Sequence, residues 1–232
     1  MPGTVAALLL AAGRGSRLRH ALPKAFVPLA GRTLLEHSIR ALESAALFAP
    51  ILPVLAPADF ERFTALGLSS SVLADPVAGG AERQDSMRAG LSALPSGVEF
   101  VAVHDAARCL VQTADLENVV AAARKTGAAL LGEPSRDTIK RVVEGRVVET
   151  PERAECWAAQ TPQIVRRDWL EEAMASAAQA GRFGTDDVQL VEWLGRPVAM
   201  VEATAPNPKI TRPEDLLLAE ALLRARAEGA SS

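Results

Sequence analysis

The sequence has few of the residues that build disulfide scaffolds or zinc sites. It contains two cysteines, Cys109 and Cys156, and three histidines in 232 residues. Disulfide-stabilised domains concentrate several cysteines in a much shorter chain, so we expect both thiols to be free in a reducing compartment. The scattered histidines and cysteines also lack zinc-binding spacing. Neither a disulfide framework nor a structural zinc site is therefore expected.

Long apolar runs and an excess of positive charge are also absent. No apolar stretch reaches the roughly 18 residues that span a bilayer. The apolar run 5–12 is short and follows no basic residues, so we expect a buried strand and not a signal peptide. The formal net charge of −3 gives no support for a polyanion-binding surface. We therefore expect a cytoplasmic protein without nucleic-acid or membrane partners.

Strand-like and helix-like segments alternate along most of the chain. The strand-like segments are 4–10, 51–56, 71–74, 99–103, 128–131 and 198–203. The helix-like segments are 33–46, 59–66, 82–94, 113–125, 166–180, 186–194 and a last helix that opens near 211, with an apolar stripe of Leu218, Ala221, Leu222 and Ala225. The alternation predicts an α/β fold with a mostly parallel, Rossmann-like sheet and helices on both faces.

The segment 135–163 interrupts this alternation. Residues 138–143 and 146–150 are short and β-rich, and Glu144-Gly145 between them predicts a hairpin. Its valines lie among charges, which suits burial in the main core poorly. We predict a projecting β-hairpin arm that packs against a second subunit, the alternative being a surface hairpin folded on its own domain. The string Gln160-Thr161-Pro162-Gln163 is expected only to brace the return of this arm.

Ligands of parallel α/β sheets bind beyond the carboxyl ends of the strands, which directs attention to the loops 11–24, 75–86 and 104–108. The first loop combines small residues with cations. Its small residues are Ala11, Ala12, Gly13 and Gly15, and its cations are Arg14, Arg17, Arg19 and Lys24. Small residues let backbone N–H groups approach an anion closely. The loop therefore predicts a phosphate site, the alternative being a glycine turn with incidental surface arginines.

Two other phosphate-binding motifs fit this loop less well. A Walker A loop needs Gly-x-x-x-x-Gly-Lys-Ser/Thr, and the chain has no such string. The dinucleotide fingerprint needs a third glycine where this chain has Leu18. A nicotinamide-dependent oxidoreductase is therefore a weaker hypothesis, although the fold class would allow it.

Six motifs in order carry a resemblance to a known family. They are Leu10-Ala11-Ala12-Gly13-x-Gly15-x-Arg17, Pro23-Lys24, Gly79-Gly80-Ala81-Glu82-Arg83-Gln84-Asp85-Ser86, Val103-His104-Asp105-Ala106-Ala107-Arg108, Arg136-Asp137-Thr138-Ile139-Lys140 and Asn207-Pro208-Lys209-Ile210-Thr211-Arg212-Pro213-Glu214-Asp215. Together they resemble the 2-C-methyl-D-erythritol 4-phosphate cytidylyltransferases of the non-mevalonate isoprenoid pathway. The resemblance runs from about residue 4 to residue 225 and implies a single nucleotidyltransferase domain, 1–232, with a dimerisation arm at about 135–163.

The resemblance implies transfer of CMP from CTP to 2-C-methyl-D-erythritol 4-phosphate, with release of pyrophosphate and with Mg²⁺ or another divalent cation. Such a reaction depends on positioning and on stabilising charge at the phosphoryl oxygens. The residues implied to be catalytic are Arg17, Lys24, Arg153 and Lys209. Those implied to bind CTP are Ala11, Ala12, Gly13, Gly15, Gly80, Ala81, Arg83 and Ser86. Arg14 and Arg19 are expected to add supporting charge.

A second set of residues is implied to hold the phosphorylated substrate. It comprises Asp105, Ala106, Arg108, Thr138, Arg153, Thr185 and Lys209, and Asp105 is also the implied metal ligand. Thr138 and Arg153 are implied to reach the partner's site in a homodimer. The chain departs from the family pattern at Ala81, where many relatives have an acidic residue, and at Cys109, where proline is usual.

Other functions remain open from the sequence. A ribitol 5-phosphate cytidylyltransferase would share the triphosphate machinery and differ in its polyol contacts. Ala107 before Arg108 and the string Arg136-Asp137-Thr138 favour the methylerythritol enzymes. A sugar 1-phosphate nucleotidyltransferase is more distant, and a catalytically silent homodimeric nucleotide-binding module is the alternative from another class.

Overall fold

A central sheet organises residues 4–13 and 15–229, the part of the chain that the computed structural model describes. Its strands are β1 (Thr4–Leu10), β4 (Phe48–Leu55), β5 (Val77–Ala78), β6 (Val98–Asp105), β7 (Ala128–Pro134), β10 (Trp157–Arg166) and β11 (Ala199–Glu202). Their order across the sheet is β11-β7-β10-β6-β1-β4-β5. All neighbouring pairs are parallel except the two that β10 makes with β6 and β7. The expected mostly parallel sheet is confirmed.

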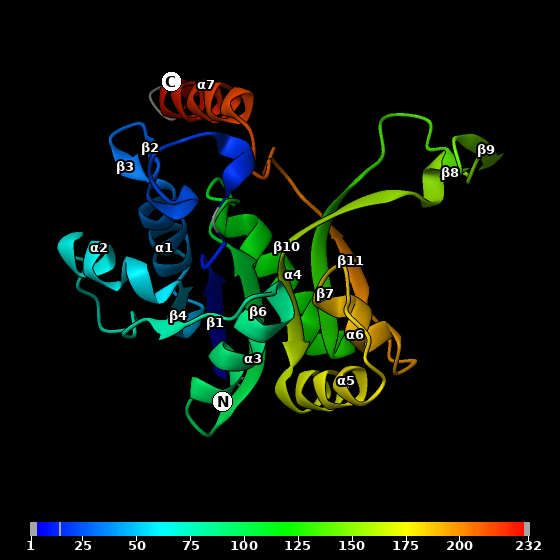
Figure 1. Cartoon of the computed structure of the whole chain (residues 1–232), viewed down its shortest axis with the longest axis horizontal. Coiled ribbons are helices and arrows are strands. Elements are labelled where there is room, and N and C mark those ends of the chain that lie inside the picture. Colours follow the sequence, from blue (N-terminus) through cyan, green and yellow to red (C-terminus); the bar gives the residue numbers. More distant parts are fainter. Residues whose placement is uncertain (1–3, 14, 230–232) are drawn as a thin grey trace.

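Helices cover both faces of this sheet (Figure 1). One face carries α1 (Leu34–Ser44), α2 (Phe60–Ala65) and α4 (Thr113–Thr126), and the other carries α3 (Arg83–Ala93), α5 (Arg167–Gln179) and α6 (Val188–Glu192). The position of β1 between two helical layers explains why every residue of this strand after Thr4 is apolar. Val5, Ala7 and Leu9 belong to the core on the first face, while Ala6 and Leu8 belong to the core on the second. Alternate residues of a strand point to opposite faces, so a strand covered on both sides needs no polar positions.

A third, smaller core lies under the loops that follow the strands. It joins Leu18, Leu34, Leu110 and Ile210 to the last helix, α7 (Pro213–Gly229). The short pair β2 (Pro28–Leu29) and β3 (Arg32–Thr33) and the 3₁₀ turn η1 (Ser16–Leu18) contribute to this core, whereas the turn η2 (Lys24–Phe26) packs on the core of the first face and the turn η3 (Pro57–Asp59) leads into α2 there. The third core therefore anchors three chain segments that surround the carboxyl ends of β1 and β6.

Strand β10 was not expected from the sequence. Gln160, Thr161 and Gln163 are polar and Pro162 lacks an N–H group, so the segment looked like a brace. The strand tolerates the proline because its pairing with β7 is irregular between Ala159 and Gln163. The three polar side chains are nevertheless buried, at 5%, 4% and 1% exposure.

The expected strand at 71–74 is wrong as a continuous element. Only Leu73 forms an isolated bridge, to Ile51, and the paired edge strand is β5, at Val77–Ala78. Pro76 separates the two because it has no N–H group to donate to β4. Ser70 also bends the entry to this segment, since its hydroxyl accepts from the Val72 N–H at 3.2 Å.

The expected apolar stripe of α7 is wrong at three of its four residues, since only Leu222 packs on the third core. Leu218 is 51% exposed, and Ala221 and Ala225 are also exposed, whereas Ala219 is fully buried. The helix packs through Leu216, Leu222 and Leu223 around Ala219. Its amino end is capped by Asp215, whose carboxylate accepts from the backbone N–H groups of Thr211 and Arg212 at 2.7 and 2.8 Å.

The hairpin arm projects from the body of the molecule (Figure 1). It consists of β8 (Arg141–Val143) and β9 (Arg146–Glu149), followed by the turn η4 (Arg153–Glu155). Its four valines are 48–60% exposed. Apolar side chains gathered on an exposed surface in this way are typical of an interaction site. No helix in the described part of the chain is long and apolar enough to cross a membrane.

Candidate active site

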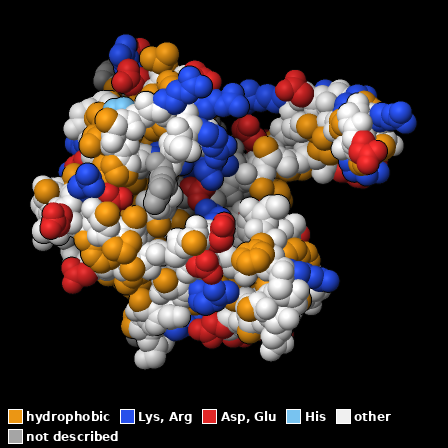
Figure 2. Space-filling model, in the orientation of Figure 1, with side chains coloured by type: hydrophobic (Ala, Val, Ile, Leu, Met, Phe, Trp, Pro, Cys, Tyr) orange, Lys and Arg blue, Asp and Glu red, His pale blue; other side chains and the backbone are white. Residues whose placement is uncertain are grey.

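A cavity lies where β1 and β6 end, at the edge expected for a ligand in such a sheet. Its lining includes Leu10, Ala11, Ala12, Gly13, Lys24, Ala25, Gly80, Ala81, Glu82, Arg83, Ser86, Asp105, Ala106, Ala107 and Lys209. Basic and acidic side chains meet near the centre of the molecular face in Figure 2. Residues from four distant parts of the sequence therefore share one cavity, and most were expected to bind ligands.

The glycine-rich loop packs directly on the stem of Lys24. Gly15 has φ of 63°, and a Cβ at this position would overlap the Cβ of Lys24. Leu18 anchors the loop in the third core, with 3% exposure, and leaves Arg17 exposed beside it. Arg19 is exposed as well, and Arg14 lies outside the described residues. The loop thus fixes Lys24 at the cavity wall and leaves the Arg17 side chain in solvent.

The pKa of Lys24 is lowered to about 8. Burial is the main cause, and the positive charge of Lys209 adds to it, while Asp105 acts in the opposite direction. Burial and a second cation nearby both disfavour the charged form of this lysine. An anion placed between Lys24 and Lys209 would favour that form.

Asp105 accepts from two cations at the end of β6. One is Arg83, and the other is Lys209, whose Nζ lies 2.6 Å from Oδ2. Burial alone would raise the pKa of Asp105, but Arg83 and Lys209 outweigh it and hold the pKa well below its usual range. Asp105 is therefore an anion at any physiological pH, and it lies between the two cations.

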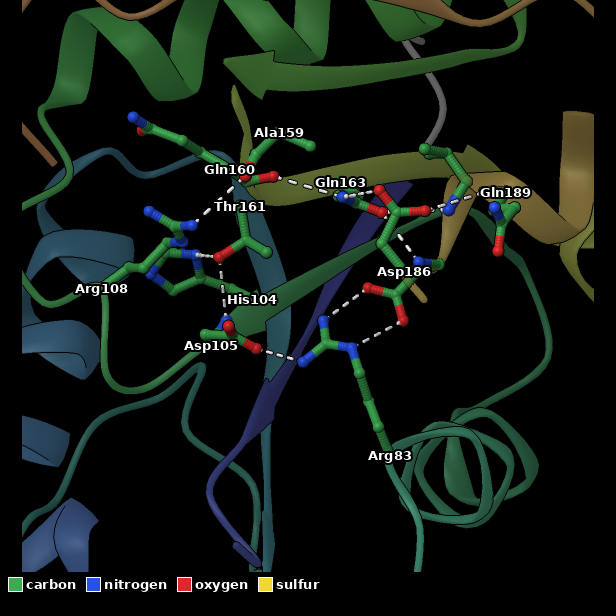
Figure 3. Close-up of polar contacts among 12 residues, drawn as sticks. Arg83, His104, Asp105, Arg108, Ala159, Gln160, Thr161, Gln163, Asp186 and Gln189 are labelled. Atoms are coloured by element: carbon green, nitrogen blue, oxygen red, sulfur yellow. Dashed lines mark hydrogen bonds and ion pairs between the residues drawn. The ribbon is translucent and has the colours of Figure 1, made fainter. Parts of the chain in front are cut away.

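Arg83 joins Asp105 to a second buried carboxylate (Figure 3). Its Nε donates to Oδ1 of Asp187 at 3.2 Å and its Nη2 donates to Oδ2 at 2.6 Å. Burial raises the pKa of Asp187, whereas both carboxylates raise the pKa of Arg83. Arg83 lines the cavity, but its guanidinium is already paired with two carboxylates. Its role is therefore to position Asp105.

Asp187 was missed by the sequence reasoning, as was Gln163 on β10. The amide oxygen of Gln163 accepts from the backbone N–H groups of Asp187 and Val188, both at 2.9 Å. Its amide nitrogen donates to Asp186 at 3.0 Å. The glutamine thus binds the start of α6 to the sheet. The adjacent acidic pair Asp186-Asp187 was the available sequence signal, and it did not indicate its contact with β10.

His104 has a structural role next to this network. The Thr161 hydroxyl accepts from the Asp105 N–H at 3.0 Å and lies 3.0 Å from Nδ1 of His104. Burial lowers the pKa of His104 to about 4, so the ring is neutral. The described residues contain no group of three or more His, Cys, Asp or Glu side chains that would hold a metal by themselves.

The loop after β5 forms the opposite wall. The Gly80 N–H donates to the Ser86 hydroxyl at 3.1 Å, which turns the loop back onto the start of α3. A Cβ at Gly79 would meet the Cβ of Ala12 at 2.5 Å, so this wall is in direct contact with the glycine-rich loop. Ala81, at the rim, is exposed.

Four expected substrate residues lie outside the cavity lining. Arg108 donates to the carbonyls of Asn207 and Ala159 at 2.9 and 3.3 Å. Thr185 is exposed, and its N–H donates to Gln189 at 2.8 Å. Thr138 and Arg153 are exposed on the arm. The cavity lining of one chain therefore lacks two arginines and two threonine hydroxyls that were expected to bind the phosphorylated substrate.

A family profile matches almost the whole chain. The profile described as 2-C-methyl-D-erythritol 4-phosphate cytidylyltransferase covers residues 5–225. The protein of that name from Desulforamulus reducens is 39% identical over 97% of this chain and 97% of its own length. The one from Syntrophotalea carbinolica is 42% identical over 95% of this chain and 96% of its own length.

Solved structures agree with these matches. The crystal structure of 2-C-methyl-D-erythritol 4-phosphate cytidylyltransferase from Thermus thermophilus has 37% identity and a TM-score of 0.76, and the match covers 95% of this chain and 99% of that one. The 4-diphosphocytidyl-2C-methyl-D-erythritol synthase from Anaerococcus prevotii gives a TM-score of 0.86 at 27% identity, covering 97% of this chain and 100% of that one.

Proposed function

The chain belongs to the 2-C-methyl-D-erythritol 4-phosphate cytidylyltransferase family, and from this premise we propose how its own residues carry out the reaction. It transfers CMP from CTP to 2-C-methyl-D-erythritol 4-phosphate and yields 4-diphosphocytidyl-2-C-methyl-D-erythritol and pyrophosphate. The observation that supports the assignment of roles is the meeting of Lys24, Asp105 and Lys209 in one cavity.

CTP binds between the glycine-rich loop and the loop after β5. Backbone N–H groups of Ala12, Gly13 and Gly15 hold the triphosphate, since the Ala11 N–H already donates to the Val54 carbonyl, and Lys24 and Arg17 stabilise the charge that develops at the α-phosphorus. Gly80, Ala81 and Ser86 contact the base and the ribose. Arg83 contributes through Asp105, because its guanidinium is already shared between two carboxylates.

The substrate phosphate binds next to Lys209. A phosphate oxygen attacks the α-phosphorus, a new P–O bond forms, and the bond to the bridging oxygen of pyrophosphate breaks with its electron pair leaving on pyrophosphate. Lys209 is well placed to orient the attacking group because its Nζ already lies in the cavity, 2.6 Å from Asp105. The chemistry needs charge stabilisation and no thiol. Consistent with this, burial raises the pKa of Cys109 to about 12.

A divalent cation fits the donor set of the cavity only together with the nucleotide. Two carboxylates line the cavity, the buried Asp105 and the exposed Glu82, and Asp105 lies at the end of β6 between the cations. Mg²⁺ is commonly held by one or two carboxylates with substrate phosphates and water. When bound, the ion would neutralise the phosphate oxygens of CTP. We assign Asp105 as its protein ligand, and Arg83 and Asp187 keep this carboxylate in place.

The arm completes the site in a homodimer. Thr138 and Arg153 lie on the arm, away from their own cavity, and the exposed valines of the hairpin need a partner surface. Contacts from a second subunit would supply the polyol and phosphate ligands that one cavity lacks. The dimer would act in the cytoplasm as a single-domain enzyme in each subunit.

Mixed dimers are expected to regain activity when two defects lie on different subunits. Arg17→Ala damages the cavity, whereas Arg153→Ala damages the arm that would serve the partner. Mixing the two variants at equal ratio should restore up to about a quarter of wild-type activity, since half the dimers are mixed and each has one intact site. The measurement is pyrophosphate release after subunit exchange. Confirmed mixed dimers without recovered activity would place Arg153 at its own site or at none.

CTP binding is expected to weaken as the pH rises through about 8. The pKa of Lys24 is about 8 in the free protein, so its ammonium is charged below that pH and becomes neutral above it. The triphosphate favours the charged form, so binding near pH 8 should take up protons. Calorimetric titrations in two buffers with different ionisation enthalpies measure this uptake. Equal uptake by Lys24→Met would assign it to another group.

Pyrophosphate release with each candidate substrate tests the overall proposal. We expect turnover with CTP, Mg²⁺ and 2-C-methyl-D-erythritol 4-phosphate, and little with ribitol 5-phosphate. Turnover only with ribitol 5-phosphate would reverse the substrate assignment. CTP binding without turnover of either substrate would favour a silent binding module. Omitting the divalent cation should abolish turnover.

A further inference from the structure

The loop that carries Lys209 has no regular secondary structure of its own. It runs from the end of β11 at Glu202 to the start of α7 at Pro213. Lys209 nevertheless holds a defined position, with Nζ 2.6 Å from Asp105. A connection of this length needs contacts outside itself to present one side chain so closely, because loop backbone is costly to order.

Several contacts fix the two sides of this loop. Before Lys209, the N–H and hydroxyl of Thr204 both donate to the buried carboxylate of Asp115 at 2.7 Å. The Asn207 carbonyl accepts from Arg108 at 2.9 Å. After Lys209, the Ile210 N–H donates to the Ala107 carbonyl at 2.8 Å. These contacts tie the loop to α4 and to the segment that follows Asp105.

Arg226 of α7 bridges both segments with a single side chain. Its Nη1 donates to the Leu110 carbonyl at 2.8 Å and its Nη2 donates to the Pro206 carbonyl at 2.9 Å. Leu110 follows Asp105 in the chain, and Pro206 precedes Lys209. The planar guanidinium sets these two carbonyls at a fixed separation, which a flexible ammonium group would not do.

Arg226 otherwise occupies an unfavourable place for a charge. Burial lowers the pKa of Arg226, and the side chain lies beside the apolar cluster that packs α7 onto the molecule. It does not line the cavity. The charge of Asp115 offsets part of this cost, but the hydrogen bonds of the guanidinium go to two main-chain carbonyls, which indicates that their geometry matters, since an apolar residue would pack α7 without desolvating a cation.

We propose that Arg226 is a positioning residue for the cytidylyl transfer: by clamping Leu110 to Pro206 it sets the separation of Asp105 and Lys209. The inference rests on the proposed role of Lys209 in holding the substrate phosphate. It gives the last helix a part in the reaction, although none of its described residues lines the cavity.

Kinetics of Arg226→Ala test the clamp. We expect kcat/KM for the phosphorylated substrate to fall about 10–100-fold, in line with the cost of a misplacement near 1 Å, while the KM for CTP changes little. Arg226→Lys keeps the charge but not the planar fork, so it should show an intermediate loss. Arg224→Ala is the matched control, because Arg224 lies on the same helix with its side chain 77% exposed and pairs only weakly with Glu220 at 3.6 Å.

A double-mutant cycle separates positioning from simple anchoring of α7. If Arg226 acts through Lys209, adding Arg226→Ala to Lys209→Ala should produce little further loss. Additive losses would overturn the proposal, as would a lower melting temperature with unchanged kinetics. If Arg226→Ala does not fold, the same cycle is run with Arg226→Lys.

The single variant Lys209→Ala distinguishes a failure of the clamp from a failure of the role proposed for Lys209. Lys209→Ala with unchanged kinetics for the phosphorylated substrate would refute the role proposed for Lys209. A damaged Lys209→Ala beside a normal Arg226→Ala would leave that role intact and overturn the clamp alone.

Discussion

Lys24→Ala is expected to lower kcat by about 10²–10³-fold, the usual loss when one preorganised charge at a transition state is removed. Lys24 is held against Gly15 at the cavity wall, and its partly desolvated ammonium faces Lys209 and Asp105. The triphosphate binds before charge develops, so the KM for CTP should rise less than kcat falls. Steady-state kinetics with both substrates varied would measure the two parameters.

The matched control for Lys24→Ala is Arg19→Ala, which removes an exposed cation from the same loop. We expect its effect to stay within a few-fold and to decrease with added salt, because exposed charges are screened. A loss confined to the KM of Lys24→Ala would mean that this lysine contributes uniform binding only.

Asp187→Ala is expected to lower the free energy of unfolding by about 3 kcal/mol, near the lower end for breaking a buried ion pair. Arg83 would lose a carboxylate whose side chain is 2% exposed, while its own is 31% exposed and retains Asp105. Urea unfolding followed by circular dichroism would measure the change. Catalysis should fall too, since Arg83 would then pair with Asp105 alone and move from its present position.

Glu171→Ala provides the comparison for Asp187→Ala. Glu171 pairs with Arg167 at 2.8 Å on the surface of α5, with 51% of its side chain exposed. Exposed pairs are usually worth less than about 1 kcal/mol. If both variants lost equally little stability, the Arg83–Asp187 pair would not be a support of the cavity wall.

The sequence predicted elements well wherever one physical signal dominated. The apolar run of β1 and the helical spacing of α1 each identify a buried face directly. Strand β10 was not predicted because several of the side chains that it buries are polar. One of them, Gln163, caps α6 by contacting residues more than twenty positions away in the chain. The packed face of α7 was predicted wrongly because the helix has too many apolar residues, not too few. The helix carries leucines on several sides, so periodicity alone did not identify Ala219 as the packed position.

The sequence predicted which residues belong to the site better than it predicted which residues contact one another. Ordered motifs assigned Lys24, Asp105 and Lys209 to one site, and the cavity does unite them. The same motifs did not show that Arg83 bridges two carboxylates or that Arg108 donates to backbone carbonyls. Such pairings depend on distances between segments that are remote in sequence, and no single-residue pattern encodes them.

The arm is inserted between two strands that are already neighbours. Pro134 at the end of β7 pairs with Trp157 at the start of β10, and the Ser135 N–H donates to the Cys156 carbonyl at 2.8 Å. The chain therefore leaves the sheet and re-enters it at adjacent rungs of one ladder. Everything between those rungs is a separable module: its length and surface can change, by evolution or by design, while the register of the sheet and the cavity stay the same. Because Thr138 and Arg153 lie within this module, a change in the arm would alter the proposed assembly and the partner's site together, and would leave the sheet beneath unchanged.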